Sequence, residues 1–207
     1  MAANPWWAPW ALNRIIEPLM RSLKIQAPSL AGMKAGDRAL DICCGTGALV
    51  LHLAKMNLVA CGIDMDPRVI QVAEKKRLKL GLETASFQVA NALNLPFEDN
   101  FFDYASISMT IHESPRAERD TIISEMRRVV KKKGKLVFID YKVPMPKIPS
   151  SYTSKIVELV AGKEHNRCFK DYLQQGGLDA LLEKHNLHVE KRGELGPLVI
   201  TVTQNNS

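Results

Sequence analysis

A glycine-rich turn is the stretch of this sequence whose residue types and spacing are best suited to chemistry. Residues 38–44 alternate apolar side chains around Asp41, and Gly45-Thr46-Gly47 then leads into residues 48–54, which have a helical composition. Glycines allow a tight turn and a close approach of a ligand to the backbone, and the first turn of a helix leaves N–H groups free to bind an anion. A buried strand, a glycine turn and a helix start therefore predict a nucleotide-like ligand.

A dinucleotide site uses a similar turn, so two interpretations compete at this point. The dinucleotide pattern requires a small third residue for close helix packing, but Val50 stands there. Asp64 ends the next predicted strand, residues 58–64, where a carboxylate can accept hydrogen bonds from both hydroxyls of a ribose. Val50 thus weakens the dehydrogenase interpretation without excluding it, and Asp64 together with Asp41, which stands four residues before Gly45, tips the balance against it.

At these residues the sequence resembles the class I S-adenosylmethionine-dependent methyltransferases. Within that class it is similar to the small ubiquinone- and menaquinone-type C-methyltransferases, whose glycine loop often reads Asp-x-Cys-Cys-Gly-Thr. The resemblance covers about residues 38–141 and includes, besides the loop, Asn91-Ala92, Leu95-Pro96-Phe97, Phe102-Asp103 and the run from Arg127 to Val137. One departure is Asn91, where the family usually has an aspartate that accepts from the adenine amino group; an amide carbonyl can also accept that bond.

The resemblance implies S-adenosylmethionine as cofactor and assigns residues to it. Asp41 and the loop would face the methionine end, Asp64 the ribose, and Met65 the adenine face, although Asp41 could instead be a helix cap or loop brace. The predicted cofactor-binding residues are Asp41, Gly45, Thr46, Gly47, Asp64, Met65, Asn91, Ala92 and Ser108.

Two residues after predicted strands are candidates for catalysis, His112 and Tyr141. Methyl transfer from a sulfonium requires mainly alignment and sometimes a base, and a histidine titrates near neutral pH. A histidine in a loop can equally be a hydrogen-bonding brace. For the acceptor pocket the predicted residues are Trp7, Trp10, Met109, His165 and Tyr172, with a solvated helix face as the alternative for the last two. We predict no metal site, because the four cysteines contain no C-x-x-C pair and suit reduced, packed thiols.

Alternation of strand and helix patterns predicts the fold that positions these residues. We expect an α/β, Rossmann-like, doubly wound and mostly parallel seven-stranded sheet, closed by a C-terminal antiparallel hairpin of residues 187–191 and 198–204. The predicted helices include 9–24, 67–80 and 117–130, while Lys133-Gly134 is expected to form a turn, residues 151–176 to be helical and the tail 204–207 to fray.

The whole chain, 1–207, is expected to be a single methyltransferase domain. It divides into an N-terminal helical lid or cap (1–30), a cofactor-binding core (31–141), an acceptor-side helical insertion (142–186) and closing strands (187–204). The lid interpretation comes from three tryptophans before an amphipathic helix; that they simply cap the core is the alternative.

Composition limits the partners. The net charge of +6 arises partly from basic runs at residues 75–79 and 127–135, which are expected to be solvated helix faces. The sequence shows neither a transmembrane segment nor a signal peptide, so we expect a cytoplasmic protein. We expect it to be a monomer or a homodimer. The predicted function is methyl transfer to a small molecule, quinone-like or another metabolite, with no nucleic acid expected. The alternatives are an RNA or other nucleic-acid methyltransferase or binding protein, and a catalytically silent cofactor-binding protein.

Overall fold

The computed structural model of the chain describes the backbone of residues 8–206 and the side chains from residue 20 onward, apart from those at 157, 160 and 207. Strands and helices alternate along most of it. The strands are β1 (Arg38–Ile42), β2 (Val59–Asp64), β3 (Ala85–Val89), β4 (Phe102–Ser108), β5 (Val130–Tyr141), β6 (Val189–Leu195) and β7 (Leu198–Gln204). The helices are α1 (Ala8–Ala31), α2 (Ala48–Lys55), α3 (Pro67–Leu80), α4 (Arg116–Val129), α5 (Pro149–Val160), α6 (Lys163–Gln174) and α7 (Gly177–Lys184).

All seven strands form one sheet in the order β3-β2-β1-β4-β5-β7-β6. The first five strands are parallel, with Ile42 level with Ile63 and with Ile107. β7 runs antiparallel to both β5 and β6, so the last two strands form a hairpin at the edge. The predicted fold class, a mostly parallel sheet closed by an antiparallel hairpin, is confirmed.

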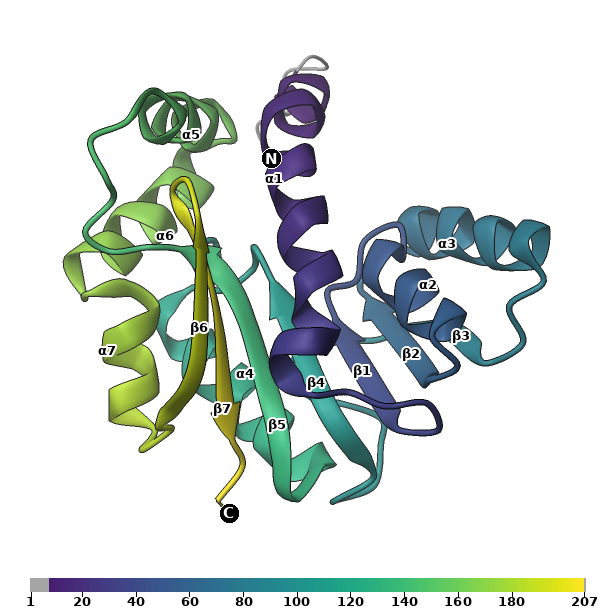
Figure 1. The fold of residues 1–207 in the computed structure, drawn as a ribbon. Coiled ribbons are helices and arrows are strands. Elements are labelled where there is room, and N and C mark those ends of the chain that lie inside the picture. The colour runs from purple at the N-terminus through teal and green to yellow at the C-terminus, as the bar shows by residue number, and fades with distance from the viewer. Residues whose placement is uncertain (1–7, 207) are drawn as a thin grey trace.

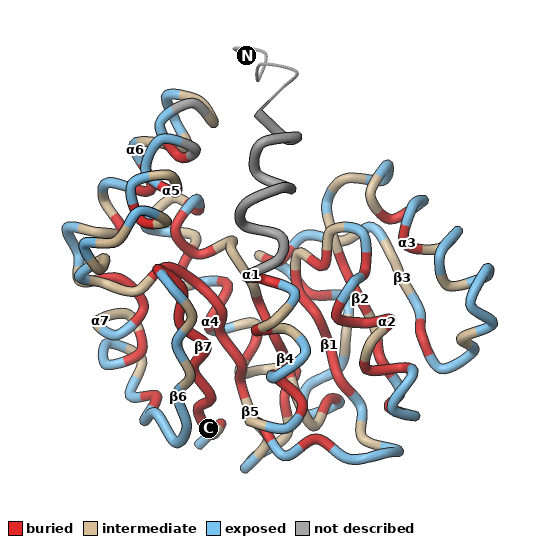
Figure 2. The backbone as a smooth tube through the Cα atoms, turned by 45° about the horizontal axis from the view of Figure 1, so that its top comes forward, coloured by how far each residue is buried: buried red, intermediate tan, exposed pale blue. Residues whose placement is uncertain are grey.

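Helices cover both faces of the sheet, as Figure 1 shows. α1, α2 and α3 pack on one face, while α4 and α7 pack on the other with α6 beside them. The central strands are largely buried between the two layers and appear red over much of their length in Figure 2. Strands with near-continuous apolar runs, such as Leu136 to Ile139, suit a parallel sheet whose two faces are both covered.

Local signals in the sequence fix the ends of α3. The Asp66 side chain accepts a hydrogen bond from the Arg68 N–H, and Pro67 occupies the first helical position, where no N–H is needed. Gly81 ends the helix with φ of +63°. This helix therefore has the limits that the sequence predicts.

Three predicted features differ in the structure. α1 extends to Ala31 rather than ending near residue 24, and its last turns bury Leu23 and Ala27 against the core. The region 151–176 is two helices, because the chain breaks at Gly162 with φ of +131°. Lys133-Gly134 is not a turn between elements; β5 begins at Val130 and runs through it.

The C-terminal residues explain why β5 runs on, and they correct the expectation of a frayed tail. Asn205 is fully buried, and its backbone exchanges hydrogen bonds with Lys133 and Gly134. Its side-chain amide donates to the carbonyls of Arg127 and Val130. This tail is tied to the core because a distant segment satisfies its polar groups, which local composition does not reveal.

Across the described residues, no helix is long and apolar enough to cross a membrane. Trp6 and Trp7 lie outside the described residues, and of Trp10 only the backbone, in α1, is described. The prediction that these tryptophans form a lid therefore stays a prediction.

Candidate functional site

The loops after β1, β2, β4 and β5 open at one edge of the sheet, because the carboxyl ends of parallel strands lie together. The glycine loop occupies this edge between β1 and α2. Gly45 and Gly47 both have left-handed backbones, with φ of +54° and +77°, and Gly47 stands at the N-terminus of α2. The Cys44 N–H donates to the Ile63 carbonyl and so ties the loop to β2.

Asp64 braces the glycine loop from the end of β2. One carboxylate oxygen accepts from the Gly45 N–H at 2.9 Å, and the other accepts from the Asp66 N–H at 3.0 Å. Each carboxylate oxygen can accept a second hydrogen bond, so the residue retains capacity for two hydroxyl donors. The structure thus gives Asp64 a bracing role that leaves the predicted ribose role feasible.

Asp41 is a buried carboxylate with an incomplete set of partners. Its Oδ1 accepts from the Ser106 hydroxyl at 2.8 Å, whereas its Oδ2 has no hydrogen-bond partner among the described groups. Burial raises the pKa of this carboxyl, although the charge of Lys24 and the Ser106 hydrogen bond act in the opposite direction. A buried carboxylate oxygen without a donor is costly, and it is suited to receive a ligand ammonium.

The loop glycines differ in what surrounds them. A Cβ built on Gly45 would meet no atom within 4 Å, so the space over this residue is open to a ligand. A Cβ on Gly47 would lie 2.5 Å from the Phe87 ring, and one on Gly62 would lie 2.8 Å from the same ring. Gly45 therefore borders an open space, which we call the cradle. At Gly47 and Gly62 the Phe87 ring occupies the space that a side chain would need. An open cradle beside an unpartnered carboxylate fits the methionine end of S-adenosylmethionine.

The remaining predicted cofactor residues lie along the same edge, in different settings. Met65 is 64 % exposed directly after β2, and Thr46 is exposed and accepts a hydrogen bond from Lys76 of α3. Asn91 uses its side-chain carbonyl to accept from the Leu93 N–H, so a bond to an adenine amino group would need the second lone pair of that oxygen. Ala92 is buried and Ser108 ends β4.

A second group of polar side chains lies on the acceptor side of this edge. His112 follows β4 and is 2 % exposed; its Nδ1 lies 2.7 Å from Asp140 Oδ1, and its Nε2 lies 3.6 Å from Glu158 Oε2. His165 of α6 contacts the same Glu158 oxygen through Nε2, and its Nδ1 lies 3.2 Å from Glu113 Oε2. One carboxylate of α5 thus stands between two imidazoles that come from distant parts of the chain.

The carboxylates set the charge of these imidazoles. Burial alone would lower the pKa of His112, but Asp140 and Glu158 raise it to about 10. Burial likewise lowers the pKa of His165, while Glu113 and Glu158 raise it to about 9. Although burial raises the pKa of Glu158, hydrogen bonds from both histidines bring it down to about 2. An imidazolium at neutral pH already holds its proton, so this arrangement does not favour His112 as a general base.

Contacts at Cys43 join the two groups. Burial raises the pKa of its thiol to about 12, against a hydrogen bond from the Thr110 side chain, and the charges of Asp64 and Glu113 also act on it. Cys43 belongs to the glycine loop, whereas Thr110 and Glu113 belong to the turn that carries His112. The polar cluster therefore borders the edge at which the cradle opens.

The two predicted tyrosines lie inside the protein. The Tyr141 hydroxyl donates to Glu158 at 2.7 Å, and burial raises the pKa of this phenol. The Tyr172 hydroxyl donates to the Tyr141 carbonyl and accepts from the Leu178 N–H, which places it in the core as a brace. Met109 is half-buried at the end of β4 with φ of +55°. Of the predicted acceptor residues, His165 belongs to the polar cluster, and the Tyr172 ring lies 6.3 Å from the His112 ring. Trp7 lies outside the described residues, and the side chain of Trp10 is not described.

Glu158 was not among the predicted site residues, whereas Glu113 and Asp140 stand next to the predicted His112 and Tyr141 at strand ends that the sequence marks for chemistry. Glu158 stands within an amphipathic helix, where a single acid predicts nothing by itself. A signal was present in the dipeptides His112-Glu113 and Glu164-His165, but their meeting depends on how α6 packs against the turn after β4.

Comparison with known proteins identifies the family. Residues 33–186 match the sequence model of a family described as a methyltransferase domain. The chain therefore belongs to the methyltransferase domain family, and the resemblance to class I S-adenosylmethionine-dependent methyltransferases is confirmed.

The relatives that the chain matches include demethylmenaquinone methyltransferases, which it covers over part of their length. The chain is 31 % identical over 155 residues to a demethylmenaquinone methyltransferase of Oceanobacillus iheyensis and 33 % identical over 147 residues to one of Bacillus cytotoxicus, matches that take in 71 % and 68 % of this chain. It spans 64 % and 61 % of the length of those relatives. A solved structure described as a SAM-dependent methyltransferase from Aquifex aeolicus shares the fold, with a TM-score of 0.65 and 21 % identity over 94 % of this chain and 92 % of that one.

Proposed function

We propose that this chain transfers a methyl group from S-adenosylmethionine to a small-molecule acceptor, with a quinone-like ring as the first acceptor class to test. Membership of the methyltransferase family supports the reaction type, and the demethylmenaquinone methyltransferases among its relatives support the acceptor class. The proposal rests on Asp41 Oδ2, which is buried without a hydrogen-bond partner among the described groups, together with the open space at Gly45 in the loop that follows the same strand.

In this proposal the chain binds and orients, and the cofactor provides the reactivity. When bound, S-adenosylmethionine supplies a methyl group activated by its sulfonium. Asp41 would hold the ammonium of the methionine end, and the free N–H groups at the start of α2 would hold its carboxylate. Asp64 would keep the ribose in place while it braces Gly45. Fixed alignment of this kind is the main contribution that a protein can make to an in-line displacement.

The acceptor would lie on the side of Met109 and His165. His165 is the more exposed of the two imidazoles of the polar cluster, with 23 % of its side chain exposed. His112 and Tyr141 would act through other groups, since both are buried and hydrogen-bonded within the protein. The predicted catalytic role of these two residues becomes a positioning role in the proposal.

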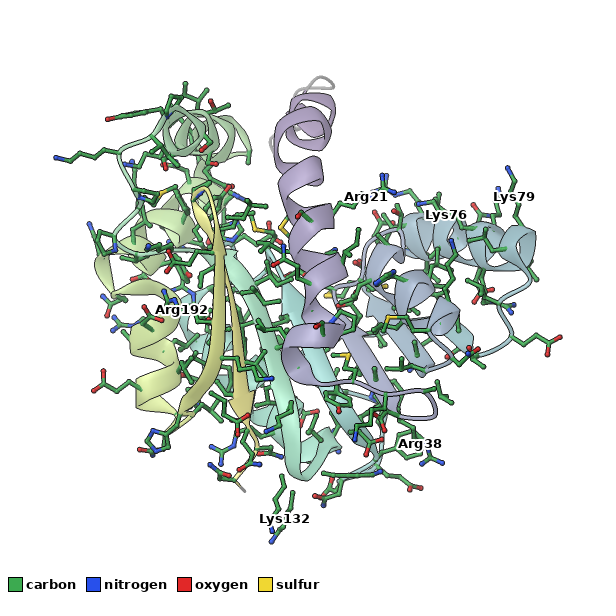
Figure 3. The ribbon with its side chains drawn as sticks, in the orientation of Figure 1. Arg21, Arg38, Lys76, Lys79, Lys132 and Arg192 are labelled. Carbon is green, nitrogen blue, oxygen red and sulfur yellow. The ribbon has the colours of Figure 1, made fainter. Side chains whose placement is uncertain are left out.

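The nucleic-acid alternative is not favoured by the arrangement of basic residues. Figure 3 shows Lys76 and Lys79 on α3 and Lys132 at the opposite end of the molecule, so the two basic runs do not form one surface. Several of these cations are paired within the protein, among them Arg77 with Glu74, Arg128 with Glu125 and Asp99, Lys131 with Asp103, and Lys135 with Glu190. Binding to phosphates would require free, clustered cations.

A binding measurement tests the cofactor assignment. Calorimetric titration of S-adenosylmethionine and S-adenosylhomocysteine is expected to give dissociation constants near micromolar, with no binding of NAD. Asp64→Asn is expected to weaken both at least about tenfold, because a charged acceptor is lost. Asp99→Asn removes an acid that pairs with Arg128 on the loop before β4, and it should leave the affinity unchanged. Preference for NAD would overturn the assignment.

Turnover tests the acceptor class separately. With S-adenosylmethionine saturating, mass spectrometry should detect one added methyl group on a reduced naphthoquinone that lacks the ring methyl. Cofactor binding without transfer to this quinol, or to catechol and thiol acceptors, would support the catalytically silent alternative. The four free cysteines suit a reducing compartment, so we also propose that the protein works in the cytoplasm.

A further inference from the structure

The cluster formed by His112, Glu158 and His165 has the ligand set of a metal site. One ligand atom from each of these side chains lies within 4.8 Å of the other two. Two imidazole nitrogens and one carboxylate oxygen suit a divalent transition metal, which needs donors about 2.0–2.2 Å away. Donor atoms around one such ion lie roughly 3–3.5 Å apart, close to the 3.6 Å between His112 Nε2 and Glu158 Oε2. The cysteine pattern predicts no metal site, but the histidines supply the ligands for one.

Each of these three side chains is held by a further polar partner. His112 Nδ1 lies 2.7 Å from an Asp140 oxygen, and His165 Nδ1 lies 3.2 Å from a Glu113 oxygen. The second oxygen of Glu158 accepts from the Tyr141 hydroxyl at 2.7 Å. Metal-binding histidines usually donate their other ring N–H to a carboxylate or carbonyl, which fixes the ring and the tautomer. The cluster has such a partner on every ligand.

The segments that carry the ligands are also fixed to each other. Arg119 of α4 is 3 % exposed and donates to the carbonyls of Ile111 and Ser114, on either side of His112. The same guanidinium donates to the Cys168 carbonyl and the Asp171 carboxylate of α6, the helix of His165. The turn after β4 and α6 are therefore held at a set separation before any ion binds.

Charge favours a cation at this position. The side chains of Glu158 and Asp140 are at most 2 % exposed. A third carboxylate, Glu113, contacts the other ring nitrogen of His165. On binding, a divalent ion would displace the Nε2 proton of each imidazole and would take the place of their positive charge beside the buried carboxylates.

We propose that His112 Nε2, Glu158 Oε2 and His165 Nε2 bind one divalent transition metal ion, with Zn²⁺ as the expected ion. Three protein ligands leave the fourth position of a tetrahedral ion open, as in catalytic rather than structural zinc sites. His165 is the most exposed of the three ligands, so the open position would lie on its side of the cluster. The metal site does not rest on the proposed methyl transfer, because an ion can bind here whether or not the chain is active.

Metal titrations without cofactor provide the test. The full chain, free of any affinity tag and treated with a chelator, is titrated with Zn²⁺ by calorimetry and with Co²⁺ by absorption. We expect one ion per chain, with visible Co²⁺ bands and without the near-ultraviolet band of a cysteine thiolate ligand. Less than half an ion per chain at micromolar protein, or a thiolate band, would overturn the proposal.

Matched variants locate the ion. His165→Ala changes the least buried ligand and is expected to weaken Zn²⁺ binding at least about hundredfold, with Glu158→Gln giving a similar loss. Tyr141→Phe removes an outer partner and is expected to weaken it about tenfold. His185→Ala removes a histidine that pairs with Asp120 instead, so it should bind as the unchanged chain does. Equal affinity in His165→Ala and His185→Ala, with circular dichroism showing both folded, would refute the site.

The open position has its own readout. Azide added to the Co²⁺-loaded chain should change the visible spectrum, because a small anion would occupy the fourth position. An unchanged spectrum at saturating azide would show that the coordination is closed and would overturn that part of the proposal.

Discussion

Asp41 is a carboxylate whose two oxygens have different surroundings. Ser106 satisfies one of them, while the other is buried without a donor among the described residues, and burial raises the pKa of the group. A protein that keeps such a group without a ligand accepts a loss of stability at its site. The residue is therefore expected to contribute to binding and to cost stability.

The variant Asp41→Asn separates these two effects. It keeps the shape and the acceptor for Ser106 but removes the charge. We expect affinity for S-adenosylmethionine to fall about tenfold to hundredfold, the value of a charge-assisted hydrogen bond. The free energy of unfolding without cofactor should be unchanged or higher, since a buried charge is gone. Calorimetric titration and urea unfolding measure the two quantities; unchanged affinity in a folded variant would remove Asp41 from the cofactor site.

The positions of residues next to strand ends could be predicted from the sequence, whereas the contacts made by residues on helices could not. Asp41 and Asp64 are adjacent in sequence to the glycine loop and to a strand end, so pattern alone places them at one edge. Glu158 joins His112 and His165 through the packing of α5 and α6, and no local pattern encodes that contact. The charge of His112 could not be predicted from the sequence for the same reason, because Asp140 and Glu158, which raise its pKa, come from distant parts of the chain.

At the scale of elements, the glycine loop combines a ligand cradle with a packing contact. Gly45 faces open space, and Gly47 faces the Phe87 ring of β3. Both have positive φ, so any side chain there carries the cost of a left-handed backbone, about 1–2 kcal/mol. Beyond this shared cost, a substitution at Gly45 would occupy ligand space and one at Gly47 would overlap the Phe87 ring.

Alanine at the two glycines is expected to change different properties, mainly cofactor affinity at position 45 and mainly stability at position 47. Gly45→Ala should lower the melting temperature by about 3 °C but reduce cofactor affinity at least tenfold, because its methyl group would enter the cradle. Gly47→Ala should lower the melting temperature by about 6 °C or more, since its methyl would overlap the ring. Phe87→Leu in the Gly47→Ala background should restore part of that loss. Thermal unfolding and calorimetry distinguish the variants; a Gly45→Ala chain that binds normally would contradict the cradle.

Element limits were predictable where the signals are local. Asp66, Pro67 and Gly81 mark both ends of α3 because capping depends on neighbouring residues. The path of β5 through Lys133 and Gly134 depends on Asn205, which is distant in the sequence, and a Lys-Gly pair by itself predicts a turn.

At the scale of the whole molecule, an ion pair and a hydrogen bond of Asp103 stabilise the edge of the sheet opposite the site. Asp103 of β4 accepts from the Arg38 N–H of β1 at 2.9 Å and from the Lys131 ammonium of β5 at 2.7 Å, so it joins three strands. Burial raises the pKa of this carboxyl, but the bonds from Lys131 and Arg38 outweigh it, and the resulting pKa is lowered.

This lowered pKa predicts how stability depends on pH. The charged carboxylate stabilises the folded state above its unfolded pKa of about 3.9, and the contribution is lost as the pH falls through the lower folded pKa. Asp103→Asn should therefore cost about 1 kcal/mol at pH 7 and almost nothing at about pH 2. Urea unfolding at both pH values tests this, with the exposed Glu98→Gln as control. A cost that is the same at both pH values would show that charge is not the cause.

The Phe87 ring restricts which residues this chain can accept at two other positions. The ring fills the space that side chains at both Gly47 and Gly62 would need, and Cys44 lies against the second of these positions. A large residue at position 87 therefore requires glycine at both positions. A smaller residue at position 87 would remove only the ring contacts, because Cys44 would still restrict position 62 and the left-handed backbone would still restrict position 47.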